Sequence, residues 1–365
     1  MACRNRYLAG ALALVVAILG PAVADVVELK PDHPERYVVV KGDTLWDISA
    51  HFLEDPWRWA SVWKINQQIK NPHLIYPGDV IVLTYVDGRP ELTVLREEEY
   101  TPTEVVEEVE EVEEEGESTG RVRRLKPKVH IEPLKEAIPT ISPAAILPFL
   151  SQPLAVSKRD LDRAGYVVLG RDDRVALGDR SQFYARGLGR DPDDYYQIFR
   201  RGKELRNPRT NEFLAYEAIY LGDAELLADG DPSKLVVTKV KQEILPTDRL
   251  LKAPKHAALP YYMPRAPDKN VRGYIVQALN SVEEFGPLTI VAISLGEREG
   301  MEEGHVLRIK YNAGKRLDPV TRRYFKVPEE DSGLLMIFRV FDKVSYALIM
   351  SAEQPIRIND IVETP

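Results

Sequence analysis

The stretch from Tyr37 to Leu83 limits the possible folds of this chain more than any other part of it. Short β-branched runs at its two ends, Tyr37 to Val40 and Val80 to Leu83, are typical of strands, and two helical patterns lie between them. Gly and Pro separate these runs, so each element is short. The sequence therefore predicts a small β-α-α-β unit of the α+β class near the start of the chain.

Capping and turn residues mark the limits of these elements. Thr44 and Asp47 have the spacing of a capping box, which predicts that the first helix begins just after Thr44. Asp55-Pro56 predicts the start of the second helix, because proline at the first helical position loses no hydrogen bond. The sequence Tyr76-Pro77-Gly78-Asp79 predicts a tight turn into the last strand.

These residues resemble the LysM family of small peptidoglycan-binding domains. The resemblance rests on Lys-Gly-Asp-Thr-Leu-Trp at 41–46, on Ile-Tyr-Pro-Gly-Asp at 75–79 and on Asn66 between them. It implies that glycans containing N-acetylglucosamine lie in a shallow groove between the loop after the first strand and the loop before the last strand. The glycan-binding residues implied on the two walls are Gly42, Asp43, Thr44 and Leu45, and Leu74, Ile75, Tyr76 and Pro77.

The residue types in these loops suit a sugar ligand. A glycan presents hydroxyls, amides and an apolar face, so a binder needs exposed backbone groups beside apolar side chains. Asp43 fits a helix cap and a ligand contact equally well. All four tryptophans of the chain lie here, and their helical spacing favours a core position over a sugar platform, with Trp57 the most exposed. The four are Trp46, Trp57, Trp59 and Trp63.

Residues 1–24 have the pattern of a cleavable secretory signal peptide. Arg4 and Arg6 precede an apolar run from Tyr7 to Leu19, and Ala22-Val-Ala24 suits signal peptidase. The apolar run is shorter than the roughly 20 residues that a membrane span needs, so we expect no transmembrane segment after cleavage. The single cysteine, Cys3, would leave with the signal, which excludes disulfides and a thiol nucleophile from the exported protein.

The negative charge of the chain is concentrated in one segment. The formal net charge is −8, and twelve glutamates without any Lys, Arg or Asp lie between Glu97 and Glu117. Five basic residues follow between Arg121 and Lys128. Dense runs of like charge are usually solvated, so we interpret 95–130 as a charged, disordered linker, with a reach on the order of 30 to 35 Å. An exported acidic protein is also a poor candidate for nucleic-acid binding.

The remainder of the chain predicts a mainly-β region behind a Pro-rich apolar segment at 131–156. Short strand patterns recur on either side of a second Pro-rich break, and two sequence parallels support a duplication. Leu205 to Phe213 parallels Leu317 to Phe325, and Leu245 to Leu251 parallels Ile356 to Val362. We therefore predict two related, small, barrel-like units, at 157–253 and 268–365.

The full arrangement is similar to one family of envelope proteins. A signal peptide, a LysM unit, a charged linker and a C-terminal region resembling the FlgT C-terminal domain are the layout of the TsaP family, the secretin-associated proteins of type IV pilus systems. The segments that carry the resemblance include 137–141, Tyr184 to Gly187, Leu295 to Gly300 and Gly333 to Phe338. The resemblance implies a noncatalytic scaffold in the periplasm that binds peptidoglycan and an outer-membrane secretin ring.

Enzymatic functions find little chemical support in the sequence. The six histidines are scattered without a His-x-His or His-Glu-x-x-His pattern, so we expect no metal site. There is no Gly-x-Ser-x-Gly elbow and no phosphate-cradling loop, so we also expect no catalytic residues and no cofactor. Two alternatives stay open: a regulator or activator of peptidoglycan hydrolases, and a component of another envelope ring such as the flagellar one.

Overall fold

The computed structural model describes ten segments of the chain: residues 27–63, 75–86, 88–95, 139–141, 143–150, 152–171, 176–189, 192–253, 262–279 and 284–365. The predicted signal peptide at 1–24 and, apart from Leu95, the predicted linker at 95–130 lie outside these residues. So do Leu74 of the predicted site and Asn66. Within the described residues, every helix is too short or too polar for a bilayer span.

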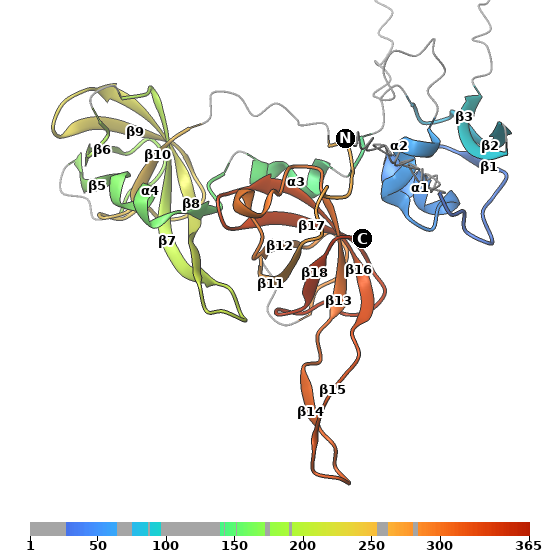
Figure 1. The fold of residues 1–365 in the computed structure, drawn as a ribbon. Helices are drawn as coiled ribbons and strands as arrows, with labels where there is room; N and C mark the ends of the chain where they lie inside the picture. The colour runs from blue at the N-terminus through green and yellow to red at the C-terminus, as the bar shows by residue number, and fades with distance from the viewer. Residues whose placement is uncertain are drawn as a thin grey trace, which may run out of the picture.

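The N-terminal unit combines a three-stranded antiparallel sheet with two short helical segments (Figure 1). Its first two strands and first helix lie where the sequence predicted them. The third strand was not predicted, and it pairs with β2 along its whole length. The elements are β1 (Arg36–Val38), α1 (Leu45–Phe52), η1 (Pro56–Arg58), α2 (Trp59–Val62), β2 (Val80–Val86) and β3 (Arg89–Leu95).

Local hydrogen bonds explain where α1 begins and why the second helix is irregular. The capping box is present, because the Thr44 side chain accepts a hydrogen bond from the Asp47 N–H and the Asp47 carboxylate accepts one from the Thr44 N–H. Asp55 precedes Pro56 as expected, but its side chain makes no capping bond. The segment therefore begins as a 3-10 turn and continues as a single α-helical turn.

The C-terminal region is mostly β, as predicted. Its first part carries two helices and a seven-stranded sheet in the order β4-β8-β7-β10-β5-β6-β9. A further pairing between β8 and β9 closes six of these strands into a ring. The elements are α3 (Pro143–Leu150), β4 (Ala155–Val156), α4 (Lys158–Arg163), β5 (Gly165–Gly170), β6 (Gln182–Arg186), β7 (Tyr195–Arg206), β8 (Phe213–Ala228), β9 (Ser233–Val240) and β10 (Arg249–Lys252).

The second part is a closed six-stranded barrel in the order β11-β12-β17-β16-β13-β18. It carries a separate two-stranded hairpin, β14-β15, between β13 and β16. The elements are β11 (Arg272–Ala278), β12 (Ile290–Ile293), η3 (Glu297–Glu299), β13 (Val306–Tyr311), β14 (Lys315–Leu317), β15 (Tyr324–Lys326), β16 (Glu330–Val340), β17 (Ser345–Ala352) and β18 (Ile361–Glu363).

Both rings enclose an apolar core and have the same cyclic order of antiparallel neighbours. The strand order of the first ring is β8-β7-β10-β5-β6-β9. Strand by strand, it corresponds to the order β16-β13-β18-β11-β12-β17 of the second ring. Phe183 and Leu221 are fully buried in the first core, and Val291 and Leu335 in the second. We call these rings barrel one and barrel two.

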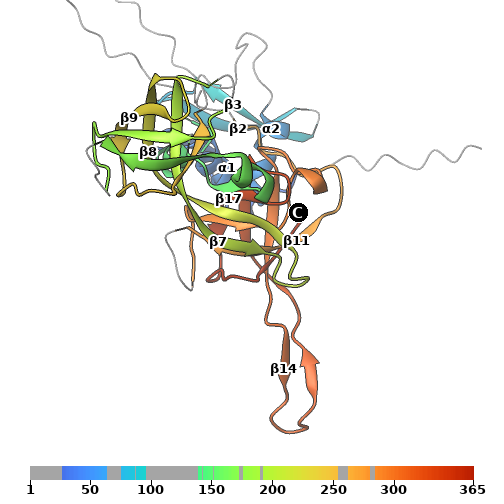
Figure 2. The ribbon, with the colours of Figure 1, turned by 90° about the vertical axis from the view of Figure 1, so that its left-hand side faces the viewer.

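The two long hairpins leave their barrels in different ways (Figure 1). The first arm, residues 204–216 at the end of β7 and β8, reaches from barrel one to barrel two. Figure 2, turned by 90°, shows β7 crossing beside β11 of barrel two. The second arm, residues 315–326, is the hairpin of β14 and β15, and in both views it extends away from the rest of the molecule.

Candidate glycan-binding site

The two loops that the sequence assigned to a glycan groove lie side by side in the N-terminal unit. Val39, just after β1, donates its N–H to the Asp79 carbonyl at 2.9 Å and accepts the Gly78 N–H at 2.8 Å. These two bonds join the loop after β1 to the turn before β2. The walls predicted from Gly42 to Leu45 and from Ile75 to Pro77 are thus neighbours.

Glycines and carboxylates give each loop its shape. Gly42 and Gly78 both have left-handed backbones, with φ of 105° and 100°, which a residue with a side chain adopts at a cost. Asp43 accepts hydrogen bonds from the Val40 N–H at 2.8 Å and from the Tyr37 hydroxyl at 3.0 Å. Asp79 likewise accepts the Tyr76 N–H at 3.0 Å. The carboxylates therefore fix the turns through their Oδ2 atoms.

The predicted site residues divide into a buried and an accessible set. Thr44, Leu45 and Ile75 are almost completely buried, so their side chains shape the walls from below and present no surface to a ligand. Gly42 and Pro77 are exposed. The side chains of Asp43 and Tyr76 are half-buried, and Leu74 lies outside the described residues. The surface that could meet a sugar is therefore formed by Gly42, Asp43, Tyr76, Pro77 and the neighbouring Gly78.

The first wall also meets a part of the chain that the sequence did not assign to the site. The Leu45 N–H donates to the Pro139 carbonyl at 3.0 Å, and the Trp46 N–H to the Thr140 carbonyl at 3.2 Å. These are first-turn N–H groups of α1, which have no partner inside the helix. The segment before α3 thus satisfies two backbone donors of the first wall. No local pattern in the sequence signals this long-range contact.

The four tryptophans lie in two different environments. Trp59 and Trp63 are buried in the core of the N-terminal unit and pack edge to face, with ring centroids 6.5 Å apart. Trp46 is also buried, but among apolar residues of 141–154 and barrel two. Trp57 is half-buried against that same cluster, as the most exposed of the four. Two tryptophans therefore hold the N-terminal unit against the C-terminal region instead of facing a sugar.

The electrostatics of the groove suit an uncharged ligand. Tyr37 lies beneath Asp43, and burial followed by its hydrogen bond to Asp43 raises the pKa of the phenol. Tyr37 also stacks on His51, with ring centroids 4.6 Å apart. The phenol stays neutral at physiological pH, and the carboxylates of Asp43 and Asp79 are turned to backbone amides. The accessible rim thus offers backbone groups and apolar surface, which match a sugar.

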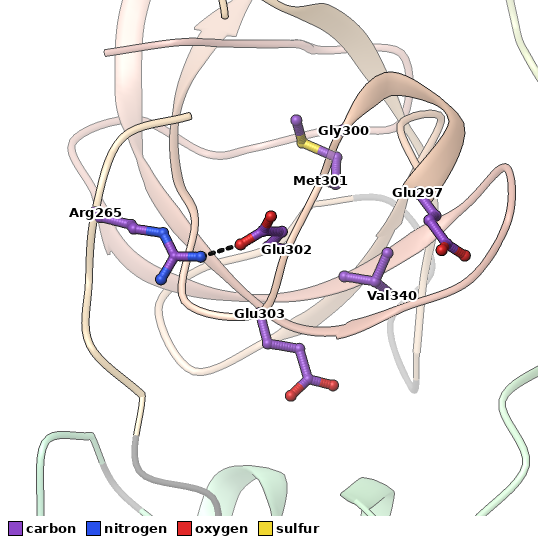
Figure 3. Close-up of a pocket in the computed structure, with 7 residues that line it drawn as sticks. All are labelled: Arg265, Glu297, Gly300, Met301, Glu302, Glu303 and Val340. Carbon is purple, nitrogen blue, oxygen red and sulfur yellow. Dashed lines mark hydrogen bonds and ion pairs between the residues drawn. The ribbon is translucent and has the colours of Figure 1, made fainter. Parts of the chain in front are cut away.

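A second hollow lies on barrel two, near the end of β16 (Figure 3). Arg265 and Glu302 form an ion pair at its edge, while Glu297 and Glu303 point away from that pair. Burial raises the pKa of Glu303. Across the described segments, no three His, Cys, Asp or Glu side chains are grouped so that they could hold a metal ion. The carboxylates of this hollow diverge, so it is no paired acid-base site.

Comparison with known proteins agrees with the geometry of the N-terminal unit. The LysM domain model matches residues 37–84. YqbP of Bacillus subtilis (strain 168), an uncharacterized protein, is 40% identical over 55 residues, which are 12% of this chain and 25% of YqbP. The chain thus spans one quarter of the length of that relative. Residues 37–84 form a LysM domain, and this domain implies binding to glycans of the peptidoglycan or chitin type.

Proposed function

We propose that the protein is a noncatalytic scaffold in the periplasm that binds peptidoglycan through its LysM domain and an outer-membrane secretin ring of a type IV pilus system through its barrels. The LysM domain at 37–84 carries the first half of the proposal. Export by the signal-like residues 1–24 supports the location.

The secretin half rests on the sequence resemblance to secretin-associated LysM proteins. The segments of that resemblance lie in both barrels: Tyr184 to Gly187 at the end of β6, Leu295 to Gly300 around η3, and Gly333 to Phe338 inside β16. A rigid barrel surface can hold a large partner while a separate module holds the wall. One shallow glycan groove gains little binding energy after the cost of association, so several copies around one ring would bind the wall through avidity.

Cosedimentation with purified peptidoglycan sacculi tests the first half. Tyr76→Ala removes a half-exposed ring from the proposed groove, and we expect it to lower the bound fraction, with an apparent affinity about tenfold weaker. Tyr85→Ala is a matched control, because Tyr85 is a 61% exposed tyrosine in β2 outside the groove. Equal binding by both variants and the parent would remove these residues from the site, and a parent that stays in the supernatant would refute glycan binding.

Affinity capture from solubilised envelopes tests the second half. A secretin recovered with the parent protein, and retained by Tyr76→Ala, would place the partner on the barrels instead of the groove. Recovery of an amidase, with release of muropeptides only when both proteins are present, would support a hydrolase activator instead. A flagellar ring component would keep the LysM assignment and replace the pilus system.

A further inference from the structure

The hydrogen bonds of the two barrels allow one to be aligned on the other, residue by residue. The Val167 N–H donates to the Asp248 carbonyl in barrel one, as the Ile275 N–H donates to the Asp360 carbonyl in barrel two. Ser233 pairs with Ala185 at the start of β9, as Ser345 pairs with Ile293 at the start of β17. Tyr166 therefore corresponds to Tyr274. Two residues before the aligned serines, Asp231 corresponds to Lys343.

The turns at the ends of the two arms also match. Asn207 accepts the N–H groups of the residues two and three positions later through its side chain, and so does Asp318. The backbone is left-handed at Asn211 in the first turn and at Arg322 in the second, with φ of 59° and 53°. In this alignment Arg209 corresponds to Val320, and Glu212 corresponds to Arg323.

The first arm is docked on barrel two through its turn. The Glu212 carboxylate accepts hydrogen bonds from Arg298 at 2.7 Å and from Lys343 at 2.9 Å. Arg209 donates to the Tyr274 hydroxyl at 3.0 Å. The one acidic residue of this turn thus lies between two basic side chains of barrel two, and Arg209 lies on the tyrosine beside them.

The second arm has the same turn, but its side chains are mostly exposed among the described residues. Val320 is 87% exposed and Tyr324 is 72% exposed. Within the part of the chain that the structure describes, Arg322 and Arg323 form no ion pair. An isolated two-stranded hairpin gains little stability by itself, so this basic and apolar arm has the composition of a contact surface.

Barrel one carries a surface of the opposite charge at the aligned position. Asp231 stands where barrel two has Lys343; its side chain forms an ion pair with Arg186 at 3.0 Å and is still 79% exposed. Tyr166, which corresponds to Tyr274, pairs with Arg186 across β5 and β6 and is also exposed. Asp229 lies two residues before Asp231 and is exposed as well. Both charges of the Glu212–Lys343 pair are therefore reversed between the second arm and barrel one.

We propose that the second arm of one copy docks on barrel one of a second copy, with Arg323 against Asp231 as Glu212 lies against Lys343, and Val320 near Tyr166. The contact joins different surfaces of the two copies, so in a dimer one copy keeps a free barrel-one surface and the other keeps a free second arm. Repetition of such a contact gives a closed ring if the rotation closes, and a filament if it does not.

The strength of this contact depends on the side chains that barrel one presents to the second arm. The first arm also rests on apolar residues of barrel two, such as Ile290 and Leu348, whereas the aligned positions in barrel one are Gln182 and Val236. Lys234 on β9 adds a positive charge near the site. We therefore expect association to be reversible, to depend on protein concentration and to weaken as salt screens the exposed charges.

Mixed cross-linking tests the head-to-tail geometry. In a Cys3→Ser background, an Asp231→Cys variant and an Arg323→Cys variant are mixed and treated with a short bismaleimide. We expect a cross-linked dimer in the mixture and much less with either variant alone. Val320→Cys with Tyr166→Cys tests the same contact at an independent pair. Lys241→Cys, at the far end of β9, replaces Asp231→Cys in the control mixture and should give no dimer.

Sedimentation velocity with charge reversals tests the charge pairing. We expect Arg323→Glu to weaken self-association at least about tenfold, and Arg323→Glu with Asp231→Arg to recover most of it. Lys315→Glu makes the same change in net charge at the base of the arm and should change association less than about twofold. A protein that stays monomeric at about 100 μM, or equal effects of Arg323→Glu and Lys315→Glu, would overturn the proposal.

Discussion

The first and second arms have nearly the same turn and opposite surroundings. The first arm is packed against barrel two, with Leu205 and Leu214 buried and Glu212 held by two cations. The second arm has Phe325 49% exposed, and Arg323 stands in the place of the glutamate. The comparison teaches that the same turn geometry forms in both arms, whereas the other residues of the turn decide what the hairpin contacts.

The largest effect on stability should come from two glycines that occupy equivalent positions in the two barrels. Gly222 and Gly333 lie where β8 meets β9 and where β16 meets β17, and a Cβ on either would collide with a carbonyl oxygen of the facing strand. Because backbone cannot move aside cheaply, Gly222→Ala and Gly333→Ala should each lower the free energy of unfolding by about 3 kcal/mol. Chemical denaturation followed by far-UV circular dichroism measures this, since every tryptophan lies in the LysM domain.

Matched controls for this prediction exist in both barrels. Gly178 and Gly286 precede β6 and β12, and a Cβ on either meets open space. Their replacement by Ala should change the free energy of unfolding by less than about 1 kcal/mol. A large loss for only one of Gly222→Ala and Gly333→Ala would show that the barrels differ where the alignment makes them equal.

The next largest effect should separate the two arms. Leu214 follows Phe213 in the first arm as Phe325 follows Tyr324 in the second, but Leu214 is only 4% exposed. Leu214→Ala should cost about 3 kcal/mol, because it leaves a cavity between the first arm and barrel two. Phe325→Ala should cost less than about 0.5 kcal/mol, because its ring is half in water. Equal costs in thermal melting would mean that the second arm is packed in solution.

A smaller, pH-dependent effect should come from Glu212. Its hydrogen bonds with Arg298 and then Lys343 lower the pKa of the Glu212 carboxyl from 4.5 to about 2. A lowered pKa means that this group stabilises the folded state above its unfolded pKa, and that the contribution is lost as pH falls from about 4.5 to about 2. Because the side chain is 37% exposed, Glu212→Gln should cost only about 1 kcal/mol at neutral pH.

The measurement is the difference in melting temperature between the parent and Glu212→Gln at several pH values. That difference should shrink as pH falls below about 4.5. Arg323→Gln, at the aligned position of the second arm, should leave the melting temperature unchanged at every pH. A parent–Glu212→Gln difference that persists at pH 2 would show that packing, and not the carboxylate, holds the first arm.

Local signals in the sequence predicted those parts of the fold that depend on neighbouring residues. Thr44 and Asp47 form the expected capping box, and the turn at Tyr76 to Asp79 closes through the Asp79 N–H and the Tyr76 carbonyl. The mostly-β C-terminal region and a closed barrel within it also agree with the prediction. Alternating apolar residues bounded by Gly and Pro are enough to predict strands and turns, because alternation and turn residues are local properties of the sequence.

Long-range contacts account for what the sequence did not indicate. The bonds from Leu45 and Trp46 to Pro139 and Thr140 join residues nearly a hundred positions apart, and no pattern in either segment signals the other. The burial of Thr44, Leu45 and Ile75 beneath the proposed groove also depends on the packed core of the domain. Strand β3 was not predicted, because its pairing with β2 follows from register, not from its composition.

The smallest effect on stability should come from the turn of the second arm. The Asp318 carboxylate accepts hydrogen bonds from the N–H groups of Val320 and Thr321 and from the Thr321 hydroxyl at 2.7 Å. These bonds lower the pKa of Asp318, but they order only residues of the turn. Asp318→Ala should therefore leave the melting temperature of the barrels unchanged and speed amide hydrogen exchange at the turn.

The aligned change in the first arm should behave differently, which makes it the sharpest test of the comparison. Asn207 orders a turn whose Arg209 and Glu212 contact barrel two, so Asn207→Ala should cost about 1 kcal/mol and lower the melting temperature. If self-association occurs as proposed, Asp318→Ala should weaken it without that loss, because the turn must be ordered to present Arg323. Equal losses of stability for Asn207→Ala and Asp318→Ala would mean that both arms belong to the folded core, and that the second arm is no free contact surface.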